Sequence, residues 1–123
     1  MQFTEIERSQ AHMLADLVEY VPHSAVFRTL IKKITGNIIA IAIDAGEKLE
    51  EKISPFDSYI QIIEGESEIV IDNHSNILGP GQAILIPAHS TNLIRANYPS
   101  KMIITVIKSG YEGIIIWQIR ILH

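Results

Sequence analysis

The alternation of apolar and polar residues divides the chain into a helical start and a long β-rich remainder. In the first part, apolar residues recur at steps of three and four, the period of an amphipathic helix. They are Ile6, Met13, Leu14, Leu17, Val18 and Val21. Thr4 and Glu7 fit a capping box, and Pro22 ends the helix or lies just beyond it. This pattern predicts a helical extension over residues 1–24, although residues 17–20 are also compatible with a strand.

From residue 25 the apolar period changes to two, which is typical of strands with one buried face. Glycine, proline, asparagine and aspartate punctuate the short runs. The predicted strands are residues 25–32, 37–43, 58–64, 67–71, 82–86, 91–96 and 101–108. Strands this closely spaced favour an all-β antiparallel sandwich or barrel over βαβ units.

The last segment, residues 113–123, also has the period of a strand. Ile115, Trp117, Ile119 and Ile121 share one side, whereas Gln118 and Arg120 lie on the other with further apolar residues. A strand with this many apolar residues would promote aggregation if it lay on an open sheet edge. We therefore expect it to be covered. Two interpretations stay open, an extra strand on the chain's own sheet or pairing with a second subunit in a homodimer.

Composition narrows the chemistry. A chain of 123 residues with 47% apolar and 20% charged residues is expected to form one globular domain. The absence of cysteine excludes disulfides, thiolate zinc sites, iron–sulfur clusters and cysteine nucleophiles. A transition-metal site would therefore have to use carboxylates and the five histidines. These are His12, His23, His74, His89 and His123.

Charge and hydropathy bear on partners and location. The formal net charge of −4 provides no basic field for a phosphate backbone, so nucleic-acid binding is not expected. No run approaches the roughly 20 apolar residues of a membrane helix. The first residues also lack the pattern of a secretory signal, so we expect a cytoplasmic protein that does not bind membranes.

Two turn-rich segments carry a more specific spacing. The first runs from Gly46 through Ser-Pro-Phe-Asp-Ser to Glu64-Gly65, and the second runs from Gly81 through Ile-Pro-Ala to Asn92. Together they resemble the two signature motifs of the cupin superfamily, and the chain is similar to small, single-domain RmlC-like cupins. The resemblance implies a double-stranded β-helix, or jelly-roll barrel, over residues 25–108. Residues 109–123 would then be an apolar strand or tail of the same domain.

The resemblance also argues against the superfamily's usual metal chemistry. It implies that two histidines and a glutamate of the first motif and a histidine of the second hold the metal. Aligned glycine to glycine, these positions are Lys52, Ser54, Ser58 and Asn92. An ammonium, two hydroxyls and an amide are poor ligands for a transition metal, so neither metal nor cofactor is expected. His89, three residues before Asn92, is expected to be a loop residue at the barrel rim.

We therefore expect a homodimer, and a metal-free module that binds a small organic ligand or mediates dimerisation. Ser54, Ser58 and Asn92 would supply neutral polar groups, and Lys52 could bind a substrate carboxylate or form a Schiff base, with Asp57 as its partner. The alternative is an enzyme. It would be a metal-dependent oxygenase or isomerase with non-standard ligands such as His89, or a metal-independent isomerase or lyase that uses Lys52 or Asp57.

Overall fold

A computed structural model describes residues 2–3, 5–51 and 53–110, which form strands and one short 3₁₀ turn. The first elements are β1 (Gln2–Phe3), η1 (Leu14–Asp16), β2 (Ala25–Lys33), β3 (Gly36–Ile43) and β4 (Lys48–Glu51). They are followed by β5 (Asp57–Glu64), β6 (Ser67–Ile71), β7 (His74–Leu78), β8 (Ala83–Ile86), β9 (Asn92–Ala96) and β10 (Ser100–Ile107).

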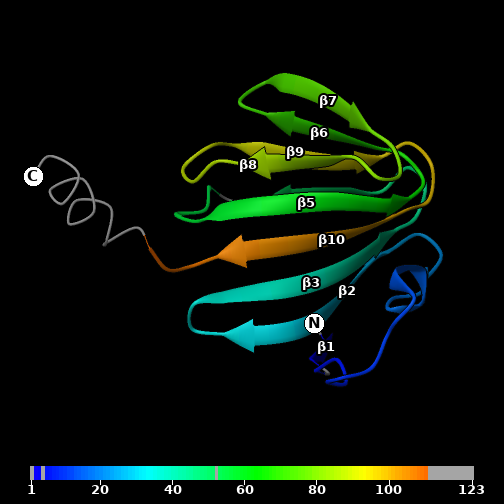
Figure 1. The fold of residues 1–123 in the computed structure, drawn as a ribbon. Helices are drawn as coiled ribbons and strands as arrows, with labels where there is room; N and C mark the ends of the chain where they lie inside the picture. Colours follow the sequence, from blue (N-terminus) through cyan, green and yellow to red (C-terminus); the bar gives the residue numbers. More distant parts are fainter. Residues whose placement is uncertain (1, 4, 52, 111–123) are drawn as a thin grey trace, which may run out of the picture.

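The strands form two sheets, one of six strands in the order β1-β2-β3-β10-β5-β8 and one of four in the order β4-β9-β6-β7. All pairings are antiparallel except that of β1 with β2. Figure 1 shows β8, β5, β10, β3 and β2 one below another, with η1 beside the lower strands. Consecutive strands repeatedly cross between the sheets, as in a jelly roll, and this confirms the predicted all-β class.

Every second side chain along a strand points into the barrel, and these side chains fill its interior. In β5, for example, Ile60 and Ile62 are buried whereas Tyr59 and Gln61 are exposed. The largest apolar side chains that are almost completely buried are Ile41, Ile43, Ile60, Ile69, Ile94 and Met102. Because so many branched side chains meet there, the middle of the barrel is a packed core.

The predicted N-terminal helix is wrong, since η1 is the only helical turn between residues 5 and 24. Ser9 has a φ of 60°, which interrupts a right-handed helix. The chain instead runs beside β2, where the Ile6 amide donates a 3.0 Å hydrogen bond to the Leu30 carbonyl. Hydrogen bonds to the backbone at the edge of β2 stabilise an extended path for this segment, although its apolar residues have a helical period.

The same segment packs outside the barrel. Leu17 and Val18 are buried against the outer face of β2, β3 and β10. They contact small or branched residues of that face, which are Leu30, Ala40, Ala42 and Ile103. A second apolar layer therefore covers about half of the six-stranded sheet.

Besides the two-residue β1, the strands β4 and β7 were not predicted. β4 lies in a run of charged residues, where Leu49, opposite Ile94 of β9, packs against the core. β7 begins at His74, directly after a tight turn. Asp72 and Asn73, with φ values of 47° and 67°, form the whole two-residue loop between β6 and β7. Both β4 and β7 lie at sheet edges, where a strand can form without a strong apolar pattern.

Some predictions fall on residues that the structure does not describe. Lys52 and the apolar segment of residues 113–123 lie outside the described residues, so their expected roles stay predictions. In the part of the chain that is described, no helix has the length and hydropathy needed to span a membrane.

Candidate functional site

The loops of the two motifs are joined at one end of the barrel. The first loop leads into β5, and the second, Pro87 to Thr91, leads into β9. The Ala88 amide donates a 2.7 Å hydrogen bond to Oδ1 of Asp57. The His89 amide donates a 2.7 Å bond to the Ser54 carbonyl, and its φ of 66° turns the backbone there. Two short bonds thus hold the loops together above the candidate site.

The hydroxyls of both loops are used locally. Oγ of Ser54 accepts a 3.1 Å hydrogen bond from the Phe56 amide, and Oγ of Ser90 donates a 2.6 Å bond to the Pro87 carbonyl. Such side-chain bonds to nearby backbone fix tight turns. Ser54 therefore shapes its own loop, in addition to any contact with a ligand.

Ser58 and Asn92 lie deeper, on inward-facing positions of opposite sheets. Ser58 shares the inner face of β5 with Ile60 and is 8% exposed. Asn92 shares the inner face of β9 with Ile94 and is partly buried. Both are the first inward residues of strands that follow the joined loops, so the fold places them at the same end of the barrel.

Asn92 has a polar atom at this end of the barrel that no described residue satisfies. Its Oδ1 is buried, yet no described residue donates a hydrogen bond to it. A buried carbonyl oxygen without a donor costs about 1–3 kcal/mol, so such atoms point to a missing partner. Asn92 occupies the position that the resemblance aligns with the metal-binding histidine of the second motif.

The two other residues suggested for chemistry are tied to the loops. Asp57 holds the Ala88 amide, so its carboxylate has a structural task at the barrel rim. His89 is an exposed loop residue there, as expected. The structure thus brings Ser54, Ser58, Asp57, His89 and Asn92 to one end of the barrel, and only Ser58 and Asn92 face its interior.

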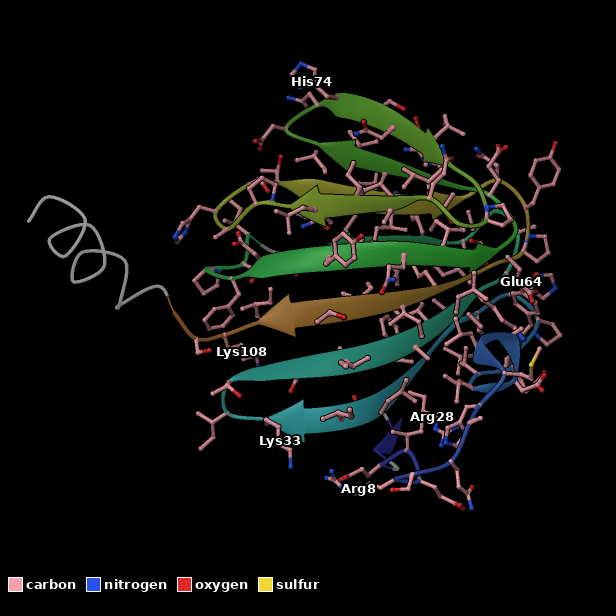
Figure 2. All side chains as sticks on the ribbon, viewed as in Figure 1. Arg8, Arg28, Lys33, Glu64, His74 and Lys108 are labelled. Atoms are coloured by element: carbon pink, nitrogen blue, oxygen red, sulfur yellow. The ribbon has the colours of Figure 1, made fainter. Side chains whose placement is uncertain are left out.

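The remaining described histidines do not approach this end as a group. His12, His23 and His74 are exposed, and Figure 2 shows His74 at the outer edge of the molecule, by the β6–β7 turn. Within residues 5–51 and 53–110, no group of three or more histidine, aspartate or glutamate side chains could hold a metal ion. The hydroxyls and the amide at the aligned positions do not fit a transition metal.

Shifted pKa values occur at the N-terminal segment, away from the candidate site. Burial, together with a 2.7 Å hydrogen bond to Oε2 of Glu64, raises the pKa of the Tyr20 hydroxyl, which stays protonated. Hydrogen bonds from the His23 and Ala45 amides, 2.7 and 2.9 Å long, lower the pKa of Asp44. These groups attach the N-terminal segment to the barrel and lie outside the candidate site.

A hollow of about 480 Å³ lies on the outer face of the six-stranded sheet, not inside the barrel. We name it the outer hollow. It is lined by Leu14, Tyr59, Gln61, Ile62, Ile63, Gly81, Gln82, Ala83 and Ile103. Period-two alternation in β5 could have placed Tyr59, Gln61 and Ile63 outside, but nothing in the sequence indicated that Leu14 would join them.

Neither a family model nor a curated protein sequence matches the chain. Solved structures do. A conserved protein of unknown function from Streptococcus pyogenes is 26% identical, with a TM-score of 0.81 over 89% of this chain and 97% of that one. A cupin superfamily protein from Desulfitobacterium hafniense is 21% identical, with a TM-score of 0.80 over 89% and 100%. An RmlC-like cupin from Desulfovibrio desulfuricans is 20% identical, with a TM-score of 0.70 over 80% and 96%.

The chain has the cupin fold, and the resemblance inferred from its two motifs is confirmed at that level. The fold is shared by proteins of many activities, so function has to be argued from the residues of the site.

Proposed function

We propose that the protein is a metal-free binding module that holds a small polar molecule at the end of its barrel, between Ser58 and Asn92. The observation that carries this proposal is the buried Oδ1 of Asn92, to which no described residue donates. A ligand with an N–H or O–H group would satisfy this oxygen. The hydroxyl of Ser58, on the facing sheet, supplies a second polar contact.

The surrounding core limits the size and charge of the ligand. Next to Ser58 and Asn92 the inward positions are apolar, with Ile86 opposite Ser58 and Ile71 opposite Asn92. A charged group would lose its hydration among these side chains. The arrangement therefore favours a compact, neutral ligand that donates one hydrogen bond, such as an alcohol or a primary amide.

Two probes of nearly equal size test the requirement for a donor. The probes are 2-propanol, which carries a hydroxyl, and acetone, which only accepts. Amide chemical shifts of the full chain are followed during titration with each. We expect saturable shifts at Ser58 and Asn92 with 2-propanol and none with acetone, because only the alcohol can donate to Oδ1 of Asn92.

Asn92→Leu keeps the approximate volume of the side chain and removes the acceptor, so it should abolish the response. Asn97→Leu is the matched control, since Asn97 is exposed, and its response should equal that of the wild type. The proposal fails if acetone shifts the same amides equally, if Asn92→Leu responds like the wild type, or if 2-propanol causes no saturable shift.

A further inference from the structure

The outer hollow leaves an apolar surface open to solvent. Leu14 is 54% exposed and Tyr59 is 40% exposed at its rim. Leu85, directly opposite Tyr59 in the β5–β8 pairing, is 49% exposed. A cluster of large exposed apolar side chains on one face usually marks an interaction surface.

This surface lies where the cover of the six-stranded sheet stops. Residues 5–24 bury the outer face of β2, β3 and β10, with Leu17 and Val18 as the main contacts. The cover reaches β5 only in part, at Ile63, and β8 lies beyond it. Among the described strands, β8 pairs only with β5, so its other edge presents backbone groups that a further strand could use.

The chain itself contains a segment that matches this surface. Of residues 113–123, seven are isoleucine, leucine or tryptophan, and four of them, Ile115, Trp117, Ile119 and Ile121, would share one side of a strand. Such a segment can add to a sheet edge as a strand, in which the backbone supplies hydrogen bonds and alternate side chains fill a hollow.

The chain beyond β10 is long enough to reach β8 and to run along it. β10 ends at Ile107, opposite Asp57 at the start of β5, and β8 is the next strand beyond β5. Reaching the free edge of β8 from β10 crosses three strand spacings, roughly 14 Å, and following the four residues of β8 takes about 13 Å. Residues 111–123 can extend over about 43 Å.

We propose that residues 113–123 dock along β8 of their own chain and cover the outer hollow. Docking within one chain is favoured because a short connection gives the segment an effective concentration near millimolar, which a second copy would have to match in solution. The proposal is independent of the ligand site, since Ser58 and Asn92 lie on the inner faces of the barrel and the outer hollow lies outside it.

Trp117 is the only tryptophan of the chain, so its fluorescence reports directly on this segment. If the segment covers the outer hollow, the emission of Trp117 is blue-shifted and protected from acrylamide. Leu85→Asp places a charge beside the hollow and should produce a red shift and a several-fold larger quenching constant, because a carboxylate cannot be buried under an apolar segment.

Ile77→Asp is the matched control. Ile77 is 54% exposed on β7, an edge strand of the other sheet, and its replacement should leave the Trp117 emission unchanged. Both substitutions are at exposed positions, and thermal unfolding checks that both variants fold. A quenching constant of the wild type equal to that of free tryptophan, or an equal response to both substitutions, overturns the proposal.

Dilution separates docking within the chain from docking between copies. We expect the Trp117 emission to stay constant from high to low protein concentration while sedimentation shows a fixed mass. A red shift on dilution that follows the dissociation of a dimer would show that the segment docks on a second copy, and would overturn the proposal.

Discussion

The ammonium of Lys101 donates a 2.6 Å hydrogen bond to the carbonyl of Ala15, 86 residues earlier in the chain. Lys101 is only 6% exposed, and its Nζ lies 5.0 Å from the centre of the Tyr20 ring, within reach of a cation–π contact. Tyr20 in turn donates to Glu64, which is opposite Lys101 in the β5–β10 pairing. One buried lysine thus attaches the N-terminal segment to the barrel.

The first prediction concerns this attachment. Lys101→Met keeps the aliphatic stem and removes the hydrogen bond, so we expect the free energy of unfolding to fall by about 2 kcal/mol, the value typical of a hydrogen bond to a charged group. Urea unfolding measures the change. Lys33→Met, at an exposed lysine of β2, is the control, and an equal loss in both variants would contradict the account.

The second prediction concerns the joined motif loops. Asp57→Ala removes the acceptor of the Ala88 amide, so hydrogen exchange at Ala88 should accelerate by about fivefold, the equivalent of roughly 1 kcal/mol. Asp72→Ala is a matched control, because Asp72 accepts from the Thr91 amide at 2.9 Å. It should accelerate exchange at Thr91 and not at Ala88. Unchanged exchange at Ala88 in Asp57→Ala would refute the role of Asp57.

The third prediction concerns pH. Because the pKa of Asp44 is lower in the folded protein, its charged form stabilises the fold, and this contribution is complete above the ordinary aspartate pKa of about 3.9. It is lost as the pH falls through the lower folded value. The difference in stability between the wild type and Asp44→Asn should therefore shrink on acidification below about pH 4. A difference that stays constant as the pH falls would argue against the two amide bonds.

The fourth prediction concerns the turn between β5 and β6. Gly65 has a φ of +74°, and a Cβ there would lie 1.9 Å from the Pro99 carbonyl oxygen. Gly65→Ala should therefore cost more than the 1–2 kcal/mol or so of a left-handed alanine alone. Gly81→Ala measures that smaller cost, since Gly81 has a φ of +83° and no atom within 4 Å of its Cβ position. Equal thermal midpoints of the two variants would contradict this account.

Much of the barrel could be predicted because its strands bury one face. The alternation of residues 58–64, for instance, is the alternation of Ile60 and Ile62 inside with Tyr59 and Gln61 outside. The N-terminal segment could not be predicted in this way. Its apolar residues have a helical period, but the edge of β2 and the left-handed Ser9 hold it in an extended path that depends on tertiary contacts.

The candidate site was predictable to a similar extent. Motif spacing placed Ser58 and Asn92 at one end of the barrel, because each begins the inner face of a strand that follows a motif loop. The spacing could not show that Asp57 is engaged by the Ala88 amide or that Oδ1 of Asn92 lacks a described donor. Both depend on how two loops distant in sequence meet. The outer hollow depends likewise on the path of η1 across β5.

The central claim is that this cupin-fold protein works without a metal, and the metal content of the purified chain tests it most directly. The full chain is produced in cells supplied with iron, manganese, nickel and zinc and is purified without chelators. Its metal content is then measured by elemental mass spectrometry. Because hydroxyl and amide groups stand at the aligned positions, we predict far less than one metal ion per chain. The triple variant Ser54→His, Ser58→Glu, Asn92→His supplies three ligands and should retain more metal. Near-stoichiometric metal in the wild type would contradict the account.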